Sequence, residues 1–323
     1  MPESSQAPAT PPLWRLVIWI ALTALLLTYH LIYVDEASGH SVDLVPHWTL
    51  ARLAATGHGA ASYRYAVQTE FLEHEVPPHK WALVLSPHIR NIGISPYPPP
   101  MIVLYAPLGL VSYERAAEIV YILSIVLALV AAAAIHGATR GRVSGFAAAA
   151  AILLYPGFLY NLMLGQNAML TLALFALGWC GLVRRWNVLA GIAWGLLIYK
   201  PHWFVAIIWL PILLLRWRVV AAMIVTGGVV CGVATIWLGP DAWTQWLTQV
   251  RALDAVTYAS REFRGWILGM ACDLRGVINR YMPGSEFARS FGWTALAVVG
   301  FIVAYQVQRV RVLSRYYENR PLP

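Results

Sequence analysis

Residues 34–98 read VDEASGHSVDLVPHWTLARLAATGHGAASYRYAVQTEFLEHEVPPHKWALVLSPHIRNIGISPYP, a long polar segment between hydrophobic ones. The segment follows the first hydrophobic run and collects many of the acids, histidines, arginines and tyrosines of the chain: Asp35, Glu36, Asp43, His47, Arg52, Tyr63, Arg64, Glu70, Glu73 and Arg90. Most of the sequence after it is apolar. We therefore expect the chemistry of the protein to lie in this segment and the remainder to form a scaffold of membrane helices.

The composition indicates an integral membrane protein. Of 323 residues, 59% are hydrophobic and only 12% are charged, whereas soluble domains carry about 25% charged residues. The net charge of +8 does not indicate a nucleic-acid partner, because the arginines cluster at helix ends, as membrane topology requires. The three cysteines, Cys180, Cys231 and Cys272, lack metal-ligand spacing and predict neither a zinc site nor a disulfide framework.

Hydrophobic runs predict an all-α, polytopic fold with about eight transmembrane helices, since a span needs about 20 apolar residues. Residues 1–12 form a Pro/Ser/Ala-rich tail that we expect to be disordered. The run that follows is too long for a signal-peptide core, and we interpret it as an uncleaved first span. At Lys200-Pro201 two short spans meet, and the proline breaks the helix there into a tight hairpin. The predicted spans are 13–33, 116–136, 144–162, 167–183, 187–200, 202–215, 219–238 and 291–308.

Positive charge predicts the orientation of these spans. Four arginine clusters should be cytoplasmic: Arg140 and Arg142; Arg184 and Arg185; Arg216 and Arg218; Arg309, Arg311 and Arg315. Both termini, including the basic tail 309–323, then lie inside a plasma membrane, and the loops 34–98 and 239–290 lie outside. This orientation requires that 98–112 is a re-entrant or surface-lying piece. A full crossing by that piece is the alternative, and it would place three of the clusters outside.

Amphipathic patterns occur within both outer loops. Residues 42–56 and 63–74 have helical spacing of apolar residues, and we expect both to be interfacial helices on the outer leaflet. Trp243 and Trp246 begin a similar pattern in the second loop, and 266–281 predicts another surface helix. The many tryptophans and tyrosines are typical of an aromatic belt at the membrane interface, although stacking against sugars remains open.

Three outer elements carry candidate site residues. Asp43 starts an amphipathic helix, and its carboxylate can take a proton from a hydroxyl nucleophile or simply cap the helix. Gln166 and Asn167 lie between two spans, where amides can bind hydroxyls or cap a helix. Lys200 and His202 lie at the hairpin tip, where they can hold a lipid phosphate; Lys200 can also merely snorkel to the interface.

Several motifs are absent from the sequence. It has no P-loop, Rossmann glycine pattern or HExxH, no serine nucleophile elbow and no Asp-x-Asp. We therefore predict no metal and no cofactor. Inverted internal repeats are also absent, which disfavours a secondary transporter.

The sequence resembles glycosyltransferase family 87, a family of polytopic GT-C class enzymes. The order and spacing of the matching motifs fit from about residue 14 to 250. The motifs are Asp43–Gly57 followed by Tyr63, Tyr97-Pro98-Pro99, Tyr155-Pro156-Gly157, Leu164–Asn167, Ala190–Pro201, Arg216-Trp217 and Gly239–Trp243. Relatives continue with further spans and a late Tyr-Asp motif, whereas this sequence stops at Pro323.

This resemblance implies transfer of a hexose, typically mannose, from a polyprenyl-phosphate donor to a lipid or glycan acceptor on the extracytoplasmic face. Asp43 maps to the family's catalytic base. Lys200 and His202 would bind the donor phosphate, and Gln166, Asn167, Tyr97 and Tyr63 would orient the sugar or phosphate. A transporter or flippase of lipid-linked sugars and a non-catalytic membrane scaffold remain as alternatives.

Overall fold

The computed structural model describes residues 43–75 and 97–259, with a few further residues between 17 and 28 and between 300 and 309. Every regular element in these residues is helical, which confirms the all-α prediction. The predicted tail 1–12 and the surface helix 266–281 lie outside the described residues, as does nearly all of the spans 13–33 and 291–308 and of the tail 309–323. The elements are α2 (Leu44–Ala55), η1 (Gly59–Ala61), α3 (Tyr65–Glu75), α5 (Pro99–Tyr105), η2 (Ala106–Leu110), α6 (Tyr113–Ala138), α7 (Gly145–Leu153), α8 (Pro156–Leu164), α9 (Ala168–Val183), α10 (Asn187–Gly195), η3 (Leu196–Tyr199), α11 (Pro201–Leu213), α12 (Trp217–Leu238) and α13 (Asp241–Ala259).

Helix starts follow local sequence signals. The hydroxyls of Ser112 and Ser144 cap α6 and α7 by accepting backbone N–H bonds, as serine commonly does at this position. Pro201 is the first residue of α11, where its missing N–H leaves no helical bond unmade. The predicted break at Lys200-Pro201 is therefore confirmed, with η3 ending at Tyr199 just before it.

Two of the described helices are long and apolar enough to cross a membrane. They are α6, with 26 residues, and α12, with 22 residues, and they coincide with the predicted spans 116–136 and 219–238. A third candidate is the pair α7 and α8, which is bent by 60° within the predicted span 144–162. Of the other predicted spans, the three that the structure describes, 167–183, 187–200 and 202–215, form shorter apolar helices, namely α9, α10 with η3, and α11. The structure thus supports two or three spans, and the count of eight stays a prediction.

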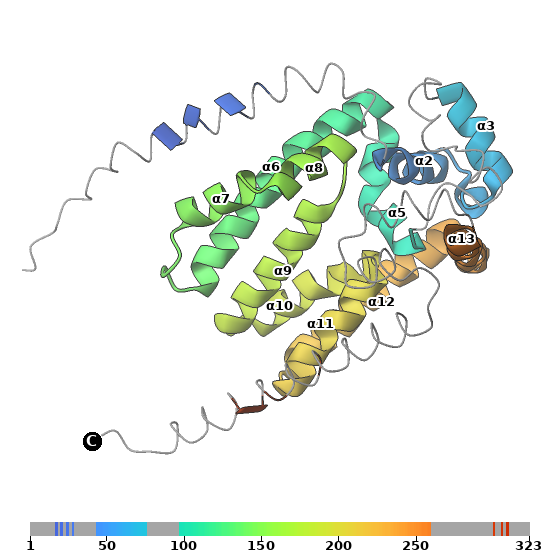
Figure 1. The fold of residues 1–323 in the computed structure, drawn as a ribbon. Coiled ribbons are helices and arrows are strands. Elements are labelled where there is room, and N and C mark those ends of the chain that lie inside the picture. Colours follow the sequence, from blue (N-terminus) through green and yellow to red (C-terminus); the bar gives the residue numbers. More distant parts are fainter. Residues whose placement is uncertain are drawn as a thin grey trace, which may run out of the picture.

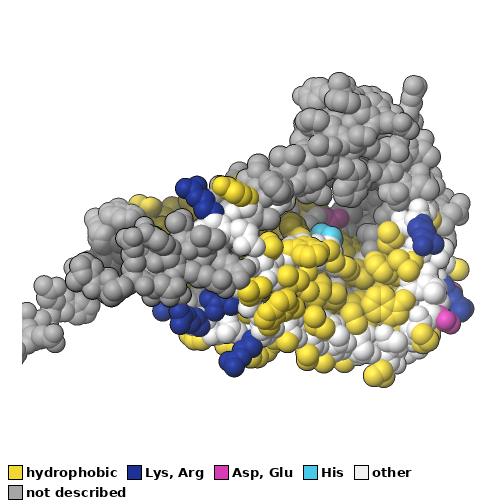
Figure 2. Space-filling model, turned by 90° about the horizontal axis from the view of Figure 1, so that it is seen from below, with side chains coloured by type: hydrophobic (Ala, Val, Ile, Leu, Met, Phe, Trp, Pro, Cys, Tyr) yellow, Lys and Arg dark blue, Asp and Glu magenta, His cyan; other side chains and the backbone are white. Residues whose placement is uncertain are grey.

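The apolar helices pack through small residues. In Figure 1, α6, α9, α10 and α12 follow one another across the molecule, and neighbours in this series are in contact. A Cβ on Gly191 of α10 would lie 2.6 Å from the carbonyl oxygen of Val219 in α12. Such a close backbone approach requires glycine and is typical of helix pairs in membranes. Hydrophobic side chains cover a large part of the described surface on the face seen in Figure 2, which fits contact with lipid.

The helix α2 is a core element. The sequence predicts an amphipathic helix on the membrane surface over 42–56, but α2 is enclosed by protein on most sides, because ten of its twelve residues are buried. The buried set includes the polar residues His47 and Thr49. The indole of Trp48 donates to the Val111 carbonyl at 3.1 Å, and Arg52 donates to the Gly109 carbonyl at 3.0 Å. These bonds fix α2 against the segment that follows α5, so the side chains of Trp48 and Arg52 are bonded inside the protein, whereas the buried Thr49 hydroxyl has no hydrogen-bond partner among the described residues.

The segment 98–112 forms α5 and η2 and packs against α2 and α12. Its twelve helical residues, Pro99–Leu110, fall well short of the roughly 20 needed to span a bilayer. This length supports the re-entrant or surface-lying interpretation. The second predicted amphipathic helix, α3, exposes Glu70 and His74 while burying Leu72, so its burial is one-sided as expected.

The arginine clusters gather at one end of the helices. The Arg184 side chain donates to the Gly137 carbonyl at the end of α6, next to the cluster that contains Arg140. Arg185 and Arg218 line one pocket. The structure therefore places three of the four predicted cytoplasmic clusters together, as a common membrane side requires.

Candidate functional site

Asp43 lies at the N-terminus of α2, and its carboxylate does not cap that helix. It occupies the N-cap position, but no side-chain cap hydrogen bond forms there. Its backbone N–H donates to the Leu164 carbonyl at 3.0 Å, and its Oδ2 accepts a hydrogen bond from the Gln166 side chain. The chain thus brings residues 43 and 166, far apart in sequence, into direct contact. The capping interpretation of Asp43 is wrong.

The Asp43 carboxylate is half-buried, and burial raises its pKa above the ordinary value. The hydrogen bond from Gln166 and the positive charge of Lys200 lower that pKa in part. A desolvated carboxylate binds a proton more readily than one in water. Asp43 therefore has the environment of a proton acceptor.

The turn between α8 and α9 presents Gln166 and Asn167 to α2. Gly165 ends α8 in the left-handed region at φ +66°, where glycine is favoured. Asn161 then holds the turn, because its carbonyl accepts from the Gln166 N–H and its side chain accepts from the Ala168 N–H. Asn167 occupies the N-cap position of α9 but makes no side-chain cap. Its amide is consequently available to α2.

His47 connects Asp43 to Asn167. Its Nδ1 is bonded to the Asp43 carbonyl oxygen, and because a carbonyl only accepts, Nδ1 carries the proton. Nε2 is then the acceptor for the Asn167 amide, at 3.1 Å. Burial lowers the pKa of His47 from 6.5 to about 3. The imidazole is therefore neutral with a single defined tautomer, which suits a structural link better than a phosphate ligand.

Aromatic side chains surround this histidine. The ring centroids of Tyr97 and Tyr105 lie 4.0 Å and 5.0 Å from that of His47. Burial, with the Asp43 charge adding to it, raises the pKa of the Tyr97 hydroxyl. The Tyr199 hydroxyl is 2.6 Å from that of Thr171 on α9. Of these tyrosines, Tyr97 is the one whose hydroxyl interacts with the Asp43 charge.

Lys200 is the N-cap residue of α11, and His202 lies in the first turn of that helix. Lys200 is half-buried, and its Nζ lies 6.0 Å from the centre of the Tyr199 ring. Its charge acts on Asp43, yet no ion pair joins the two within the described part of the chain. His202 is exposed and lies beside Trp203, at 5.4 Å between ring centroids. Lys200 and Asp43 are therefore close enough to interact electrostatically, although they form no ion pair.

Tyr63 is linked to the site through the backbone of Tyr97. It is buried, and its hydroxyl donates to the Tyr97 carbonyl at 2.7 Å. Its own carbonyl accepts a hydrogen bond from Gln249 on α13. Tyr63 is therefore placed to hold Tyr97 in position, whereas the sequence predicted that it orients the sugar or phosphate itself.

The structure brings together Asp43, Gln166, Asn167, Tyr97 and Lys200, which the sequence singled out. An acidic and a histidine side chain also lie next to each other within the hydrophobic surface of Figure 2. No role was predicted from the sequence for His47, Tyr105 or Thr171. The signal for His47 was its spacing, because it follows Asp43 by four residues and so shares one helix face with it. In residues 43–75 and 97–259, no three His, Cys, Asp or Glu side chains gather as a metal site would require.

Comparison with known proteins gave one family. Curated proteins gave no match, and neither did solved structures. The sequence model of glycosyltransferase family 87 matches residues 96–320. That range contains Tyr97, the 165–167 turn and Lys200, while Asp43 and His47 lie before it. Because the match covers more than two thirds of the sequence and runs through the turn that holds Asp43, the chain belongs to glycosyltransferase family 87.

Proposed function

We propose that this membrane glycosyltransferase takes a hexose, mannose in the first instance, from a polyprenyl-phosphate donor and transfers it to a hydroxyl of a lipid or glycan acceptor. The observation that carries the proposal is the pairing of a half-buried carboxylate, whose pKa burial raises, with a half-buried lysine that does not touch it. The carboxylate deprotonates the acceptor hydroxyl, and the lysine stabilises the charge of the donor phosphate.

The reaction uses these groups in one displacement. Asp43 removes the proton from the acceptor hydroxyl, whose oxygen attacks the anomeric carbon of the sugar. The bond from that carbon to the phosphate oxygen breaks, and polyprenyl phosphate leaves with the electron pair and its negative charge. Lys200, with His202 at the rim, stabilises that charge electrostatically. Attack opposite the leaving group inverts the anomeric centre.

The remaining residues position the two reactants. Gln166 holds the carboxylate of Asp43, and the link from His47 to Asn167 fixes α2 against the start of α9. Tyr97 lies beside Asp43, where its hydroxyl can donate to the sugar or phosphate. The scheme requires no metal and no cofactor, because side-chain cations neutralise the leaving phosphate. We place the site on the extracytoplasmic face of the plasma membrane, opposite the arginine clusters.

Turnover of radiolabelled polyprenyl-phosphate mannose by the purified full chain in lipid vesicles tests this function. We expect Asp43→Asn to lower transfer by roughly 10²–10⁴-fold, the usual loss when general-base help is removed. Asp241→Asn, in the first turn of α13, is the matched control and should transfer at the wild-type rate. Wild-type transfer by a folded Asp43→Asn protein would show that the base lies elsewhere, with Asp35 and Glu36 next in line. A flippase or a scaffold would show no turnover in the wild type.

A further inference from the structure

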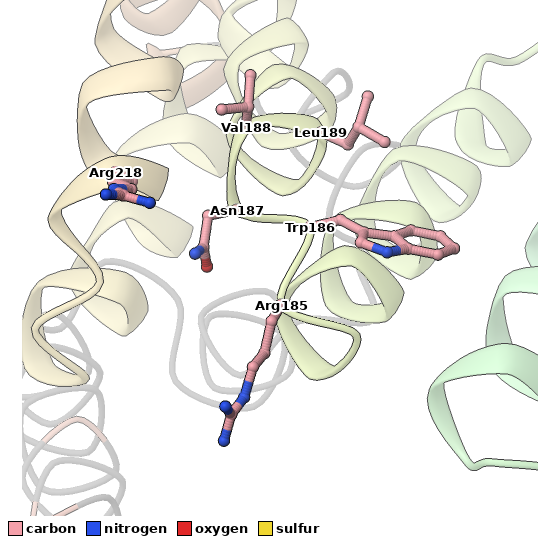
Figure 3. Close-up of a pocket in the computed structure, with 6 residues that line it drawn as sticks. All are labelled: Arg185, Trp186, Asn187, Val188, Leu189 and Arg218. Atoms are coloured by element: carbon pink, nitrogen blue, oxygen red, sulfur yellow. The ribbon is translucent and has the colours of Figure 1, made fainter.

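We infer that the protein has a second ligand site, at the end of the helices where the arginine clusters gather, which binds one anionic phospholipid. The site is a pocket of about 390 Å³ between the starts of α10 and α12. Its lining is Arg185, Trp186, Asn187, Val188, Leu189 and Arg218 (Figure 3).

The polar part of the pocket carries positive charge without a partner. Arg185 and Arg218 approach it from two different elements, with Asn187 between them in Figure 3. Within the described residues, neither guanidinium forms an ion pair or a hydrogen bond. Guanidinium groups bind phosphate in a bidentate manner. Two unpaired arginines at one pocket therefore indicate an anion of that kind.

Two helix starts add to this charge. Neither α10 nor α12 has a side-chain cap or an acidic residue in its first turn. The first N–H groups of a helix have no partner inside it, and the helix dipole makes this end positive. The pocket thus lacks the acidic or capping side chains that would otherwise satisfy these ends.

The apolar part of the pocket identifies the source as a lipid. Val188 and Leu189 are 58% and 60% exposed, and Trp186 is 56% exposed. These side chains continue from the arginines along α10, an apolar helix of the membrane region. Basic pockets between membrane helices are typical sites for anionic headgroups. The phosphate would bind at the arginines, and the acyl chains would follow the exposed aliphatic residues.

Native mass spectrometry of the purified full chain in detergent, titrated with phosphatidylglycerol, tests the inference. We expect one phosphatidylglycerol to be retained, and phosphatidylcholine to be retained much more weakly. The double variant Arg185→Gln/Arg218→Gln should bind phosphatidylglycerol about tenfold more weakly or worse, because each charged hydrogen bond is worth more than a factor of ten. Arg142→Gln, an exposed arginine away from the pocket, should bind like the wild type.

Val188→Asp separates loss of the site from loss of the fold. Val188 is exposed in the first turn of α10, where a carboxylate favours the helix, so thermal stability should hold, while the carboxylate repels the lipid phosphate and should abolish retention. Equal phosphatidylglycerol retention by wild type and either pocket variant would overturn the proposal, as would an equal loss in Arg142→Gln. Displacement of the lipid by an equal concentration of inorganic phosphate would show that the site takes a free anion instead.

Discussion

The carboxylate of Asp43 is subject to opposing effects. Burial favours its neutral form, while the Gln166 hydrogen bond and the Lys200 charge favour the anion. A base works only when deprotonated, so transfer should fall on the acid side of the pKa of Asp43. We expect Gln166→Leu to raise that pKa further and to move the acid limb of the pH–rate profile to higher pH. Transfer rates of wild type and variant across the pH range measure this shift.

Gln245→Leu is the matched control for that experiment. The Gln245 amide donates to the carbonyl of Ala60 in η1. Loss of this hydrogen bond should leave the acid limb of the pH–rate profile in place. If Gln166→Leu and Gln245→Leu have the same acid limb, Gln166 does not act through the carboxylate.

His47 makes a separate prediction about stability. Its folded pKa of about 3 lies below its ordinary value of 6.5. Between these values the unfolded chain takes up a proton that the folded chain does not, so stability falls as pH falls below 6.5. His47→Gln should remove this part of the pH dependence, and thermal unfolding at pH 7 and pH 5 measures it. His74→Gln, on the exposed part of α3, should keep the wild-type slope. A wild-type slope in His47→Gln would mean that His47 is not held neutral by burial.

At the scale of elements, the position of α2 depends on Gly109 in η2. A Cβ there would lie 2.4 Å from the backbone carbonyl carbon of Ala51, and backbone cannot move aside as a flexible side chain can. Gly109→Ala should therefore lower the free energy of unfolding by about 1–3 kcal/mol, the usual cost of overpacking. It should also slow transfer, because α2 carries Asp43. Denaturation and turnover assays on the same preparation measure both effects.

Gly228 in α12 is the control position for Gly109, because the same substitution has free space there. A Cβ there would meet nothing within 4 Å, and alanine is favoured over glycine within a helix by about 0.5–1 kcal/mol. Gly228→Ala should thus be neutral or stabilising. A Gly109→Ala protein as stable as Gly228→Ala would show that η2 and α2 are not in tight contact.

Local sequence signals were sufficient for part of the fold. Length and apolar content predicted α6 and α12, and a proline predicted the break before α11. Burial of α2 could not be predicted in the same way, because its buried histidine finds its side-chain partner only in the tertiary structure: His47 pairs with Asn167, 120 positions away. The same is true of the site. Residue chemistry singled out Asp43 and Gln166, but the contact that makes Asp43 more than a cap joins two distant segments.

At the scale of the whole molecule, the candidate site on α2 and the arginine clusters lie near opposite ends of α6. The helix α6 has 26 residues, so it is about 39 Å long and reaches across a bilayer core of about 30 Å. Its first residues lie near α2, where Trp48 contacts Tyr113. Its last turn receives the hydrogen bond from Arg184. Figure 1 shows α2, α3 and α13 grouped at one end of the molecule.

This separation gives a topology that can be tested. Ala60 is exposed in η1, whose neighbour Gly59 approaches Leu238 at the end of α12, whereas Arg142 is exposed beyond the opposite end of α6. Because arginine clusters favour the cytoplasmic side, we expect Ala60 outside and Arg142 inside. In a background without Cys180, Cys231 and Cys272, a membrane-impermeant maleimide added to intact cells should label Ala60→Cys at once. It should label Arg142→Cys only after the membrane is opened. Labelling of both variants in intact cells would exclude this arrangement and favour a full crossing by 98–112.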